Sequence, residues 1–392
     1  MDKWVSKLKK NKIALVIYAR FPSEMGYGNH IIQVANGFLK NNFDVSIYYP
    51  KTYNSKTITQ NPETYYEVTN NINFKEIKNF DVTSFSIYEL LPSVLKMFIY
   101  SISTLFWSFR LKRYLQNEEY VWSTNPNVLN VLKKCFDNVI YEKHGAARFI
   151  QKYSINQLKK ANNTTLIGVT RKSVEELYNK IKEPLYLPNG VDGDFFFPNS
   201  EQNEEITIGY IGLLETYGID KGVLSSVEEI IKVNEELKTK TLIVGGPKNK
   251  LDEIQKVVNT NEQSSYFDIK NFIPHNEVPN VIRQMQIGIV PYPNESHMKF
   301  YASPLKIFEF AACGVPVLLS DIDSHLELKS LNLGIYYFKN NDFDDFRQKL
   351  IELIKDSDLR NSLRKKSLDN INNLFWDKRI KKIVDSVRSS TG

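Results

Sequence analysis

The chain has 392 residues, more than a single hydrophobic core of ordinary size holds, and this length predicts two domains of similar size. A hydrophobic content of 42% and a charged content of 24% are those of an ordinary soluble globular protein. The net charge of +6 is mild and is not gathered into basic stripes, so no nucleic-acid partner is expected. Two distant cysteines argue against a disulfide framework or a zinc site and fit a reducing, cytoplasmic compartment.

The first half of the chain predicts alternating strands and helices. An apolar strand over 12–19 is followed by a glycine-containing loop, SEMGYGNH, then an amphipathic helix from His30 and a second strand over 44–49. This order is the repeating unit of a parallel sheet. The first apolar run is short and ends at Arg20, so it predicts a strand and not a signal peptide. Further strands are expected at 120–123, 138–142, 166–169 and 185–187.

Residues 97–109, MFIYSISTLFWSF, contain no charged side chain. The flanks are basic, with Lys96 before the segment and Arg110, Lys112 and Arg113 after it. The segment is too short to span a bilayer, which takes about 20 residues. Short apolar runs usually form buried helices, and that is the first interpretation. The second is an interfacial helix, with peripheral membrane contact through 97–113.

A second series of strands and helices begins after the turn PNGVDGD at 188–194. Helices are expected after Lys221 and over 251–258. The expected strands lie at 206–211, 240–244, 268–272, 287–290 and 315–319. We therefore predict an α/β protein with two parallel-sheet domains, residues 1–190 and 191–370, followed by a C-terminal helix over 371–392.

The stretch SPLKIFEFAACGVPVLLSD, residues 303–321, is the most informative part of the chain. Ser303 suits an N-cap and Pro304 suits the first helical position, where its missing N–H is not needed. Gly314 is expected to end the helix, and the VPVLLS that follows predicts a buried strand.

Ser303, Lys306 and Glu309 are spaced by three residues, so they lie on one face of this otherwise apolar helix. The start of a helix favours phosphate oxygens through its dipole and its free amides. A carboxylate one to two turns further on can accept both hydroxyls of a ribose. The arrangement therefore suits a nucleotide. The alternative is a Lys306–Glu309 ion pair on the surface of an ordinary amphipathic helix.

Several short segments, in order along nearly the whole chain, resemble the retaining glycosyltransferases of GT-B architecture, family 4 type. They are GYGNH (26–30), EKHG (142–145), LPNGVD (187–192), IGYIGLL with DKG (208–222), LIVGG (242–246) and ASPLKIFEFAACGVPV (302–317). The resemblance implies two Rossmann-like domains facing a central cleft, with a C-terminal helix that crosses back to the first domain. It also implies a nucleotide-diphosphate-sugar in the C-terminal domain and an acceptor in the N-terminal one.

The resemblance implies roles for residues of the second half. Glu309 matches the carboxylate that binds the nucleotide ribose. Leu305 and Lys306, with Ser303 before them, lie where backbone amides would meet the diphosphate. Lys221 matches the lysine of the KG motif, expected to neutralise the diphosphate as it leaves. Without this match, Lys221 would be a solvated charge at a helix start, where it opposes the helix dipole.

In the first half, His144 matches a histidine close to the transferred sugar, and Gly26 and Gly28 would let the first loop approach donor and acceptor. A hydrogen-bonded loop histidine is the alternative for His144. We take His144, Lys221 and Glu309 as the candidate catalytic residues.

Two positions depart from the family pattern. Leu213, directly after the donor-binding Gly212, stands where many members have an arginine. Tyr301 stands where the commonest pattern has a second glutamate that contacts the donor sugar. We keep Tyr301 among the donor-binding residues, with its effect on sugar specificity left open, and Leu213 implies one cation fewer at the diphosphate.

Acidic clusters at 192–194, 321–323 and 342–345 fall in a turn, at a strand end and at a helix cap, which are structural positions for aspartate. We therefore expect no metal and no other cofactor. His297 and His325 belong to no motif and are expected at the surface.

The sequence thus predicts a glycosyltransferase that moves a hexose-type sugar from a nucleotide-diphosphate-sugar to a saccharide or lipid-linked acceptor. Cell-surface glycan synthesis, in the cytoplasm or at the inner face of the cell membrane, is the expected setting. Retention of configuration is implied by the resemblance alone. Because no carboxylate nucleophile is recognisable, we expect a same-face displacement. Two alternatives stay open: a nucleotide-sugar 2-epimerase, and a non-catalytic nucleotide-sugar-binding subunit.

Overall fold

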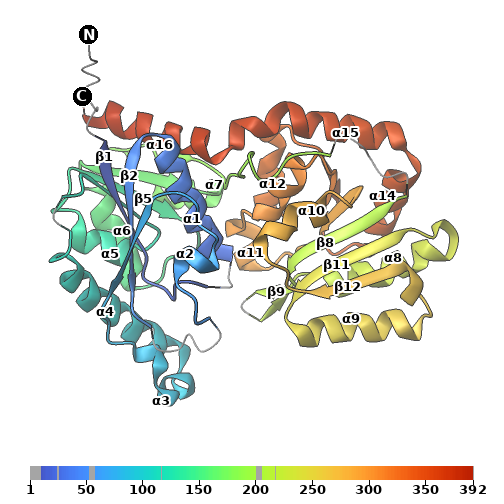
Figure 1. The fold of residues 1–392 in the computed structure, drawn as a ribbon, viewed down its shortest axis with the longest axis horizontal. Coiled ribbons are helices and arrows are strands. Elements are labelled where there is room, and N and C mark those ends of the chain that lie inside the picture. The colour runs from blue at the N-terminus through green and yellow to red at the C-terminus, as the bar shows by residue number, and fades with distance from the viewer. Residues whose placement is uncertain are drawn as a thin grey trace, which may run out of the picture. The chain divides into compact units, whose positions relative to one another are not determined.

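The computed structural model describes residues 10–23, 26–52, 58–115, 117–199, 205–216 and 218–391. The chain divides into two compact units (Figure 1). The first consists of Met1–Val169, Ser173–Leu187 and Trp376–Gly392, and the second of Thr170–Lys172 and Pro188–Phe375.

The first unit is built on a seven-stranded parallel sheet in the order β3-β2-β1-β4-β5-β6-β7. Its strands are β1 (Asn11–Val16), β2 (Phe43–Pro50), β3 (Ile72–Ile77), β4 (Tyr120–Ser123), β5 (Asn138–Lys143), β6 (Thr164–Gly168) and β7 (Leu185–Tyr186). The strand order reverses between β1 and β4, which is where open α/β sheets bind ligands.

Helices connect these strands. The last helix of the chain also belongs to this unit, which confirms the predicted return of the C-terminal helix to the first domain. Asn41, just beyond α1, donates from Nδ2 to the carbonyl of Asp377 at 2.8 Å, so α16 packs against α1 (Figure 1). The helices are α1 (Gly26–Lys40), α2 (Pro62–Tyr65), α3 (Ser86–Leu90), α4 (Ser93–Leu111), α5 (Pro126–Leu132), α6 (Ile150–Lys159), α7 (Arg171–Leu177) and α16 (Trp376–Thr391). A short 3₁₀ turn, η1 (Val82–Ser84), precedes α3.

The second unit contains a six-stranded parallel sheet in the order β12-β11-β8-β13-β14-β15. Its strands are β8 (Thr207–Leu213), β11 (Lys240–Gly246), β12 (Phe267–Asn271), β13 (Ile287–Val290), β14 (Val317–Ser320) and β15 (Ile335–Phe338). A two-stranded antiparallel hairpin, β9 (Glu215–Thr216) and β10 (Ile219–Asp220), follows β8. The order reverses between β8 and β13, again a switch point.

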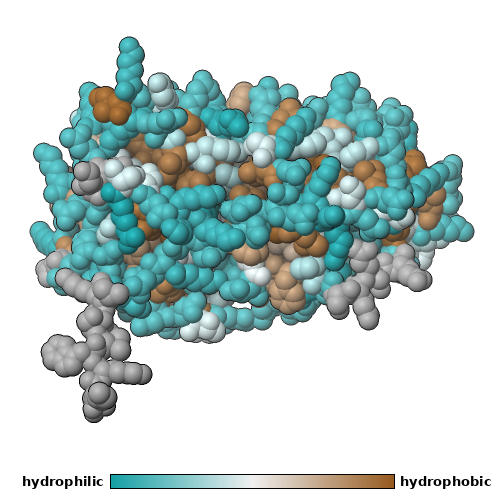
Figure 2. Space-filling view, turned by 90° about the horizontal axis from the view of Figure 1, so that it is seen from above, coloured by the Kyte–Doolittle hydropathy of each residue, from teal (hydrophilic) through white to brown (hydrophobic). Residues whose placement is uncertain are grey.

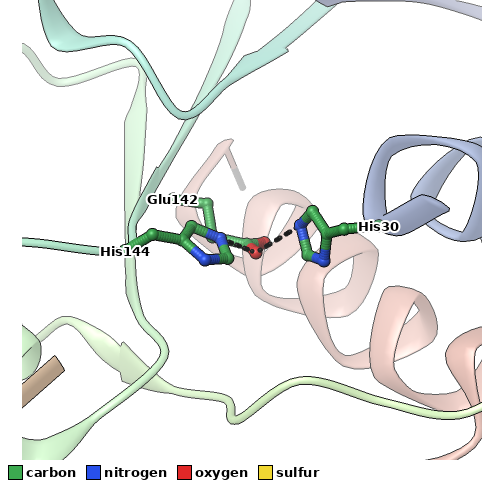
Figure 3. A group of neighbouring side chains, drawn as sticks. All are labelled: His30, Glu142 and His144. Atoms are coloured by element: carbon green, nitrogen blue, oxygen red, sulfur yellow. Dashed lines mark hydrogen bonds and ion pairs between the residues drawn. The ribbon is translucent and has the colours of Figure 1, made fainter. Parts of the chain in front are cut away.

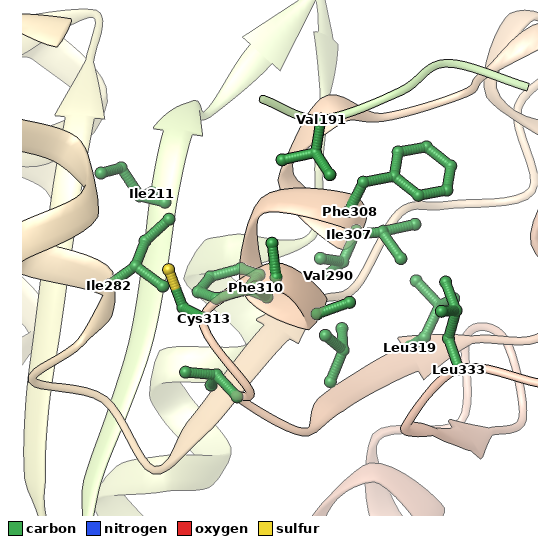
Figure 4. Packing of buried hydrophobic residues seen from close by; sticks show 14 of the residues in the cluster. Val191, Ile211, Ile282, Val290, Ile307, Phe308, Phe310, Cys313, Leu319 and Leu333 are labelled. Carbon is green, nitrogen blue, oxygen red and sulfur yellow. The ribbon is translucent and has the colours of Figure 1, made fainter. Parts of the chain in front are cut away.

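The helices of the second unit cover the faces of this sheet (Figure 1). Among them, α12 carries Ile307, Phe308 and Phe310 into the core, where Figure 4 shows them among Val290 and Leu319. The helices are α8 (Val223–Leu237), α9 (Lys248–Thr260), α10 (Val278–Ile282), α11 (Ser296–Tyr301), α12 (Leu305–Ala312), α13 (Asp323–Leu326), α14 (Phe343–Lys355) and α15 (Ser357–Asn370). The 3₁₀ turns are η2 (Ser264–Tyr266), η3 (His275–Glu277), η4 (Glu327–Leu331) and η5 (Ile371–Leu374).

The apolar segment at 97–109 forms most of α4, and its predicted burial holds for Trp107 but is wrong for its three phenylalanines. Phe98, Phe106 and Phe109 are exposed, whereas the smaller Thr104 and Ser108 are fully buried and return hydrogen bonds to the preceding helical turn. In the part of the chain that the structure describes, no helix combines the length and the apolarity needed to span a membrane.

Candidate functional site

In the second unit, predicted residues gather at the carboxyl ends of β8 and β13, the two strands at the switch point. Gly212 lies near the end of β8 with a φ of +139°, a conformation that favours glycine. Lys221 follows the hairpin after β8, and its Nζ lies 5.0 Å from the centroid of the Tyr292 ring, just beyond β13. Lys221 is largely buried, so it is not the solvated surface charge of the alternative interpretation.

The backbone after Lys221 fixes this arrangement. Gly222 has a φ of +77°, and a Cβ there would lie 2.4 Å from the carbonyl oxygen of Pro291, so only glycine lets this turn approach the end of β13. The carboxylate of Asp220 accepts the Gly222 N–H at 2.6 Å. The lysine at the start of α8 is thereby held beside the end of the neighbouring strand.

Of the two histidines predicted at the surface, His297 is partly exposed, whereas the prediction is wrong for His325. His297 is partly buried and stacks on Tyr301 with ring centroids 6.4 Å apart. Burial, and then the charge of Lys221, lower the pKa of His297. His325 is fully buried, and its Nδ1–H donates to the Ser320 carbonyl at 2.9 Å. Sequence reasoning missed the burial of His325 because it lies in no recognisable motif.

On α12, Lys306 Nζ and Glu309 Oε2 lie 2.7 Å apart, as their spacing predicted. Glu309 is only 5% exposed, so the pair is not an ordinary surface ion pair. A Cβ at Gly212 would lie 3.7 Å from Lys306 Cε, so the pair sits beside the end of β8. Gly212, Lys306 and Glu309 are thus brought together.

The predicted capping of α12 is wrong. The helix begins at Leu305 and its N-cap is Pro304, which makes no side-chain capping bond. Ser303 Oγ instead accepts the Asn189 N–H at 3.1 Å, and Asn189 Nδ2 donates to the Ser303 carbonyl at 2.7 Å. The Ser303 hydroxyl therefore bonds the PNGVD turn and does not cap the helix. The contact connects this turn to the start of α12. The Ile307 N–H donates to the Pro304 carbonyl at 3.2 Å. The N–H groups of Leu305 and Lys306 precede any i−4 carbonyl of the helix, and amides in this position favour an anion.

In the first unit, the sequence predicted Gly26 and Gly28 in a loop. The structure places both of them in the first turn of α1. A Cβ at Gly28 would lie 2.0 Å from Tyr66 Oη and 3.0 Å from the Ser23 carbonyl. At Gly26, a Cβ would have no described atom within 4 Å. Gly28 is therefore required by packing against the Tyr66 hydroxyl, which itself bonds the Ser23 backbone.

His144 belongs to a cluster centred on the Glu142 carboxylate at the end of β5 (Figure 3). Glu142 Oε1 lies 2.7 Å from His144 Nε2 and 3.3 Å from His30 Nε2, with the two rings on either side of the carboxylate. Glu142 Oε2 accepts from Arg379 at 3.0 Å and from the Trp122 indole at 3.4 Å. His144 is the partly exposed histidine, whereas His30 and Glu142 are buried.

Glu142 and His30 differ in their charge at neutral pH. Burial opposes the charge of Glu142, but Arg379, the hydrogen bond from His144 and the nearby His30 ring hold its pKa well below the usual range. Burial lowers the pKa of His30 to about 4, although Glu142 favours its protonation. At neutral pH Glu142 is therefore an anion that orients His144, and His30 is neutral. His144 is a hydrogen-bonded histidine held in one orientation, with its ring reaching the surface.

His30, Glu142 and His144 are residue types that coordinate metal ions, and one candidate ligand atom from each lies within 4.8 Å of the others. Both carboxylate oxygens of Glu142 already have close partners, and the fixed charge of Arg379 at 3.0 Å opposes a further cation. We therefore describe the cluster as a hydrogen-bonded one. Sequence reasoning missed His30 and Glu142, although residues 142 and 144 point to the same side of an extended strand.

A polar hollow of about 390 Å³ lies at the opposite edge of the first sheet, where β1, β2 and β3 begin. Its lining includes Lys12, Asp44, Asn73 and Glu118, and none of the predicted site residues. Because parallel sheets bind ligands at the carboxyl ends of their strands, we do not assign it to the site.

Comparisons with known proteins concern the sequence of the second unit and the fold of the chain. Residues 205–356 match the family model described as glycosyl transferases group 1. The structure is similar to a glycosyltransferase from Rickettsia africae, with a TM-score of 0.71, 14% identity, and coverage of 97% of this chain and 99% of that chain. It is also similar to a sucrose-phosphate synthase from Thermosynechococcus elongatus, with a TM-score of 0.69, 14% identity, and coverage of 97% and 99%.

A third similar structure is the Anabaena protein HepE in complex with UDP and glucose, with a TM-score of 0.65, 12% identity, and coverage of 96% of this chain and 100% of that chain. No curated protein sequence matches the chain. The resemblance to GT-B glycosyltransferases is confirmed, and the fold is two Rossmann-like parallel-sheet domains of the GT-B type.

Proposed function

We propose that this chain, with a glycosyl transferases group 1 sequence in its second unit and a GT-B fold, transfers a sugar from a nucleotide-diphosphate-sugar to a saccharide or lipid-linked acceptor. One observation carries the proposal. The matched residues 205–356 include Gly212, Lys306 and Glu309, which lie together beside the end of β8, and Lys221, which lies beside Tyr292 just beyond β13. The HepE structure contains UDP and glucose, which supports a nucleotide-sugar as donor.

Donor binding uses α12. Glu309 accepts the hydroxyls of the nucleotide ribose, and Lys306, at 2.7 Å, orients this carboxylate. The first-turn amides of α12, from Leu305 onward, and the Lys306 side chain face the diphosphate. Tyr301 takes the place of the second glutamate beside the sugar, and its ring is held by His297.

In the reaction, the bond between the anomeric carbon and the diphosphate oxygen breaks, and the acceptor oxygen bonds to the same carbon. The leaving phosphate oxygen takes the proton of the acceptor hydroxyl. Negative charge grows on the diphosphate as its bond breaks, so the fixed positive charge of Lys221 and the α12 amides act most strongly in the transition state. Attack from the face that the diphosphate leaves gives retention of configuration.

His144 is assigned to the transferred sugar by the family resemblance, and this role stays a prediction. A hexose-type sugar, a role in cell-surface glycan synthesis and a cytoplasmic location at the inner membrane face are parts of the same proposal. The charged Glu142 would then keep His144 in a single orientation.

Thermal unfolding with a panel of nucleotide-sugars tests donor binding first. A ligand at a hundred times its dissociation constant adds about 2.7 kcal/mol, which raises the melting temperature of a unit of this size by about 5–10 °C. The donor that shifts the melting temperature is then mixed with saccharide acceptors. Release of nucleoside diphosphate only with acceptor supports a transferase. An epimerase would convert the donor without acceptor, and a binding subunit would show the shift without turnover.

A further inference from the structure

The first unit presents large apolar side chains to solvent along η1, α3 and α4. We call this set the α3–α4 surface. Leu90 is 84% exposed and Phe106 is 73% exposed, values far from those of core residues. Monomeric proteins rarely leave so many large apolar side chains together at the surface without a partner. The members are Phe80, Phe85, Ile87, Leu90, Val94, Leu95, Phe98, Phe106 and Phe109.

Contacts within the unit place these residues on one surface. The rings of Phe80 and Phe85 lie 5.7 Å apart, which joins the segment before η1 to α3. Tyr88 on α3 donates to the carbonyl of Lys96 on α4 at 3.2 Å. On α4, Leu95, Phe98, Ile102, Phe106 and Phe109 follow the helical repeat, so they form one stripe along its length.

The opposite face of α4 explains why the apolar stripe points outward. Trp107 and Leu111 fill the core, and the rest of this inward face is formed by side chains with hydroxyl groups. Tyr100 Oη donates to the carbonyl of Tyr18 at 2.6 Å, and Ser103 Oγ donates to the carbonyl of Phe80 at 3.3 Å. The helix is therefore anchored by hydrogen bonds and a few core contacts, and the outward stripe is not needed for packing.

The charge along α4 has one sign, whereas α3 contributes Glu89. Residues 93–114 contain four basic side chains and no aspartate or glutamate. Arg110 and Arg113 are exposed at the end of α4, and Lys112 Nζ lies 5.5 Å from the centroid of the Phe109 ring. A cation beside an exposed aromatic ring is the arrangement that suits the boundary between lipid headgroups and acyl chains.

The face that carries α15 and α16 is different. In Figure 2 it is mostly hydrophilic, and its hydrophobic residues lie in scattered groups between polar ones. The scattered groups on this face contrast with the continuous apolar stripe of the α3–α4 surface.

We propose that the α3–α4 surface docks on an anionic lipid bilayer, with α4 lying in the plane of the interface. The helix has 19 residues and is about 28 Å long, at 1.5 Å per residue, so Phe98, Phe106 and Phe109 enter the headgroup boundary along its whole length. A second copy of the chain fits less well, because a symmetric dimer through this stripe brings its positive rims together. The docking does not depend on the proposed activity, but it would bring a lipid-linked acceptor within reach.

Cosedimentation of the full chain with vesicles tests the proposal. Vesicles of phosphatidylcholine containing a quarter phosphatidylglycerol are compared with pure phosphatidylcholine, at low and at high salt. Binding is expected only with the anionic vesicles and is weakened by salt. The triple variant Arg110→Gln, Lys112→Gln, Arg113→Gln is expected to bind about a hundredfold more weakly, at about fivefold for each charge.

Matched variants distinguish binding through the α3–α4 surface from binding caused by the overall charge or apolarity of the protein. Three exposed lysines of the second unit give the charge control, Lys355→Gln, Lys365→Gln, Lys366→Gln, which is expected to bind like the parent. Phe106→Ser is expected to weaken vesicle binding about tenfold, whereas Phe272→Ser, at a position 55% exposed in the second unit, leaves it unchanged. Melting temperatures show that each variant folds.

Equal binding to neutral and anionic vesicles, binding to neither, or equal effects of Phe106→Ser and Phe272→Ser would overturn the proposal. A dimer in the absence of lipid that Phe106→Ser dissociates would also overturn it and assign the surface to a second copy. Donor-induced melting shifts on the same preparations report the proposed function separately, so either can fail without the other.

Discussion

Replacing Glu309 by glutamine tests the donor site with little disturbance of the fold. The carboxylate is buried on α12 and lies 2.7 Å from Lys306 Nζ. Glutamine keeps the size and shape of the side chain and removes only the charge. The side chain of Lys306 is 26% exposed, so its ammonium group regains water when its partner is neutral. Because Glu309 itself is buried, we expect the free energy of unfolding to fall by about 1–3 kcal/mol, and a melting curve shows that the variant stays folded.

Donor binding is expected to weaken as well. A hydrogen bond to a charged group in a desolvated site contributes about 1.5–3 kcal/mol. Its loss raises the dissociation constant of the preferred nucleotide-sugar by roughly 10- to 150-fold. Isothermal titration calorimetry on parent and variant measures this directly.

The matched control for this variant is Glu253→Gln on α9. Glu253 pairs with Lys250 at 2.9 Å with the same spacing of three residues, but it is more exposed and far from the predicted site in sequence. Its dissociation constant for the donor is expected to equal that of the parent. A Glu309→Gln variant that binds donor as tightly as the control would refute the assignment of Glu309 to the ribose.

Three further predictions concern single residues. Lys221→Ala is expected to lower kcat at least tenfold more than it weakens donor binding, because the diphosphate charge grows in the transition state; equal losses in steady-state kinetics and calorimetry would contradict this. Gly28→Ala is expected to destabilise the first unit by about 1–3 kcal/mol in urea unfolding, because its Cβ meets Tyr66 Oη, while Gly26→Ala is neutral or slightly stabilising; similar unfolding midpoints would show that Gly28 is not packed as described. Burial lowers the pKa of His325 to about 4, so as pH falls below 6.5 the unfolded chain binds a proton that the folded chain does not. The free energy of unfolding of the second unit should therefore fall by about 2 kcal/mol between pH 7 and pH 5, and His325→Asn should reduce this difference; a melting temperature that does not change between these pH values would be inconsistent with a buried neutral imidazole.

Strands with buried, uniformly apolar sequences could be predicted from the sequence. β4 and β13 have the expected bounds, and both are buried along their whole length. β3, INFKEI, was missed because it is an edge strand whose Lys75 and Glu76 are exposed, so it lacks the apolar run of a central strand. β15, IYYF, was missed because most of it is only partly buried.

In the site, contacts between residues close in sequence could be predicted, and contacts between residues far apart in sequence could not. The Lys306–Glu309 pair could be predicted because a spacing of three residues on a helix is a local property. Asn189, 114 residues from Ser303, could not be linked to it from sequence, and it is the reason that the predicted N-cap failed. Arg379 reaches Glu142 across 237 residues, because the fold returns α16 to the first unit. Contacts of this kind follow from topology.

The central claim is the transfer of sugar from donor to acceptor, and nucleoside diphosphate release measures it most directly. The nucleotide-sugar that raises the melting temperature is incubated with and without saccharide and lipid-linked acceptors, and free nucleoside diphosphate and the glycosylated product are measured together. We predict that both rise in equal amounts when one acceptor is present and that both are lost in Lys221→Ala. Conversion of the donor without acceptor, or donor binding with no release from any pair, would contradict the account.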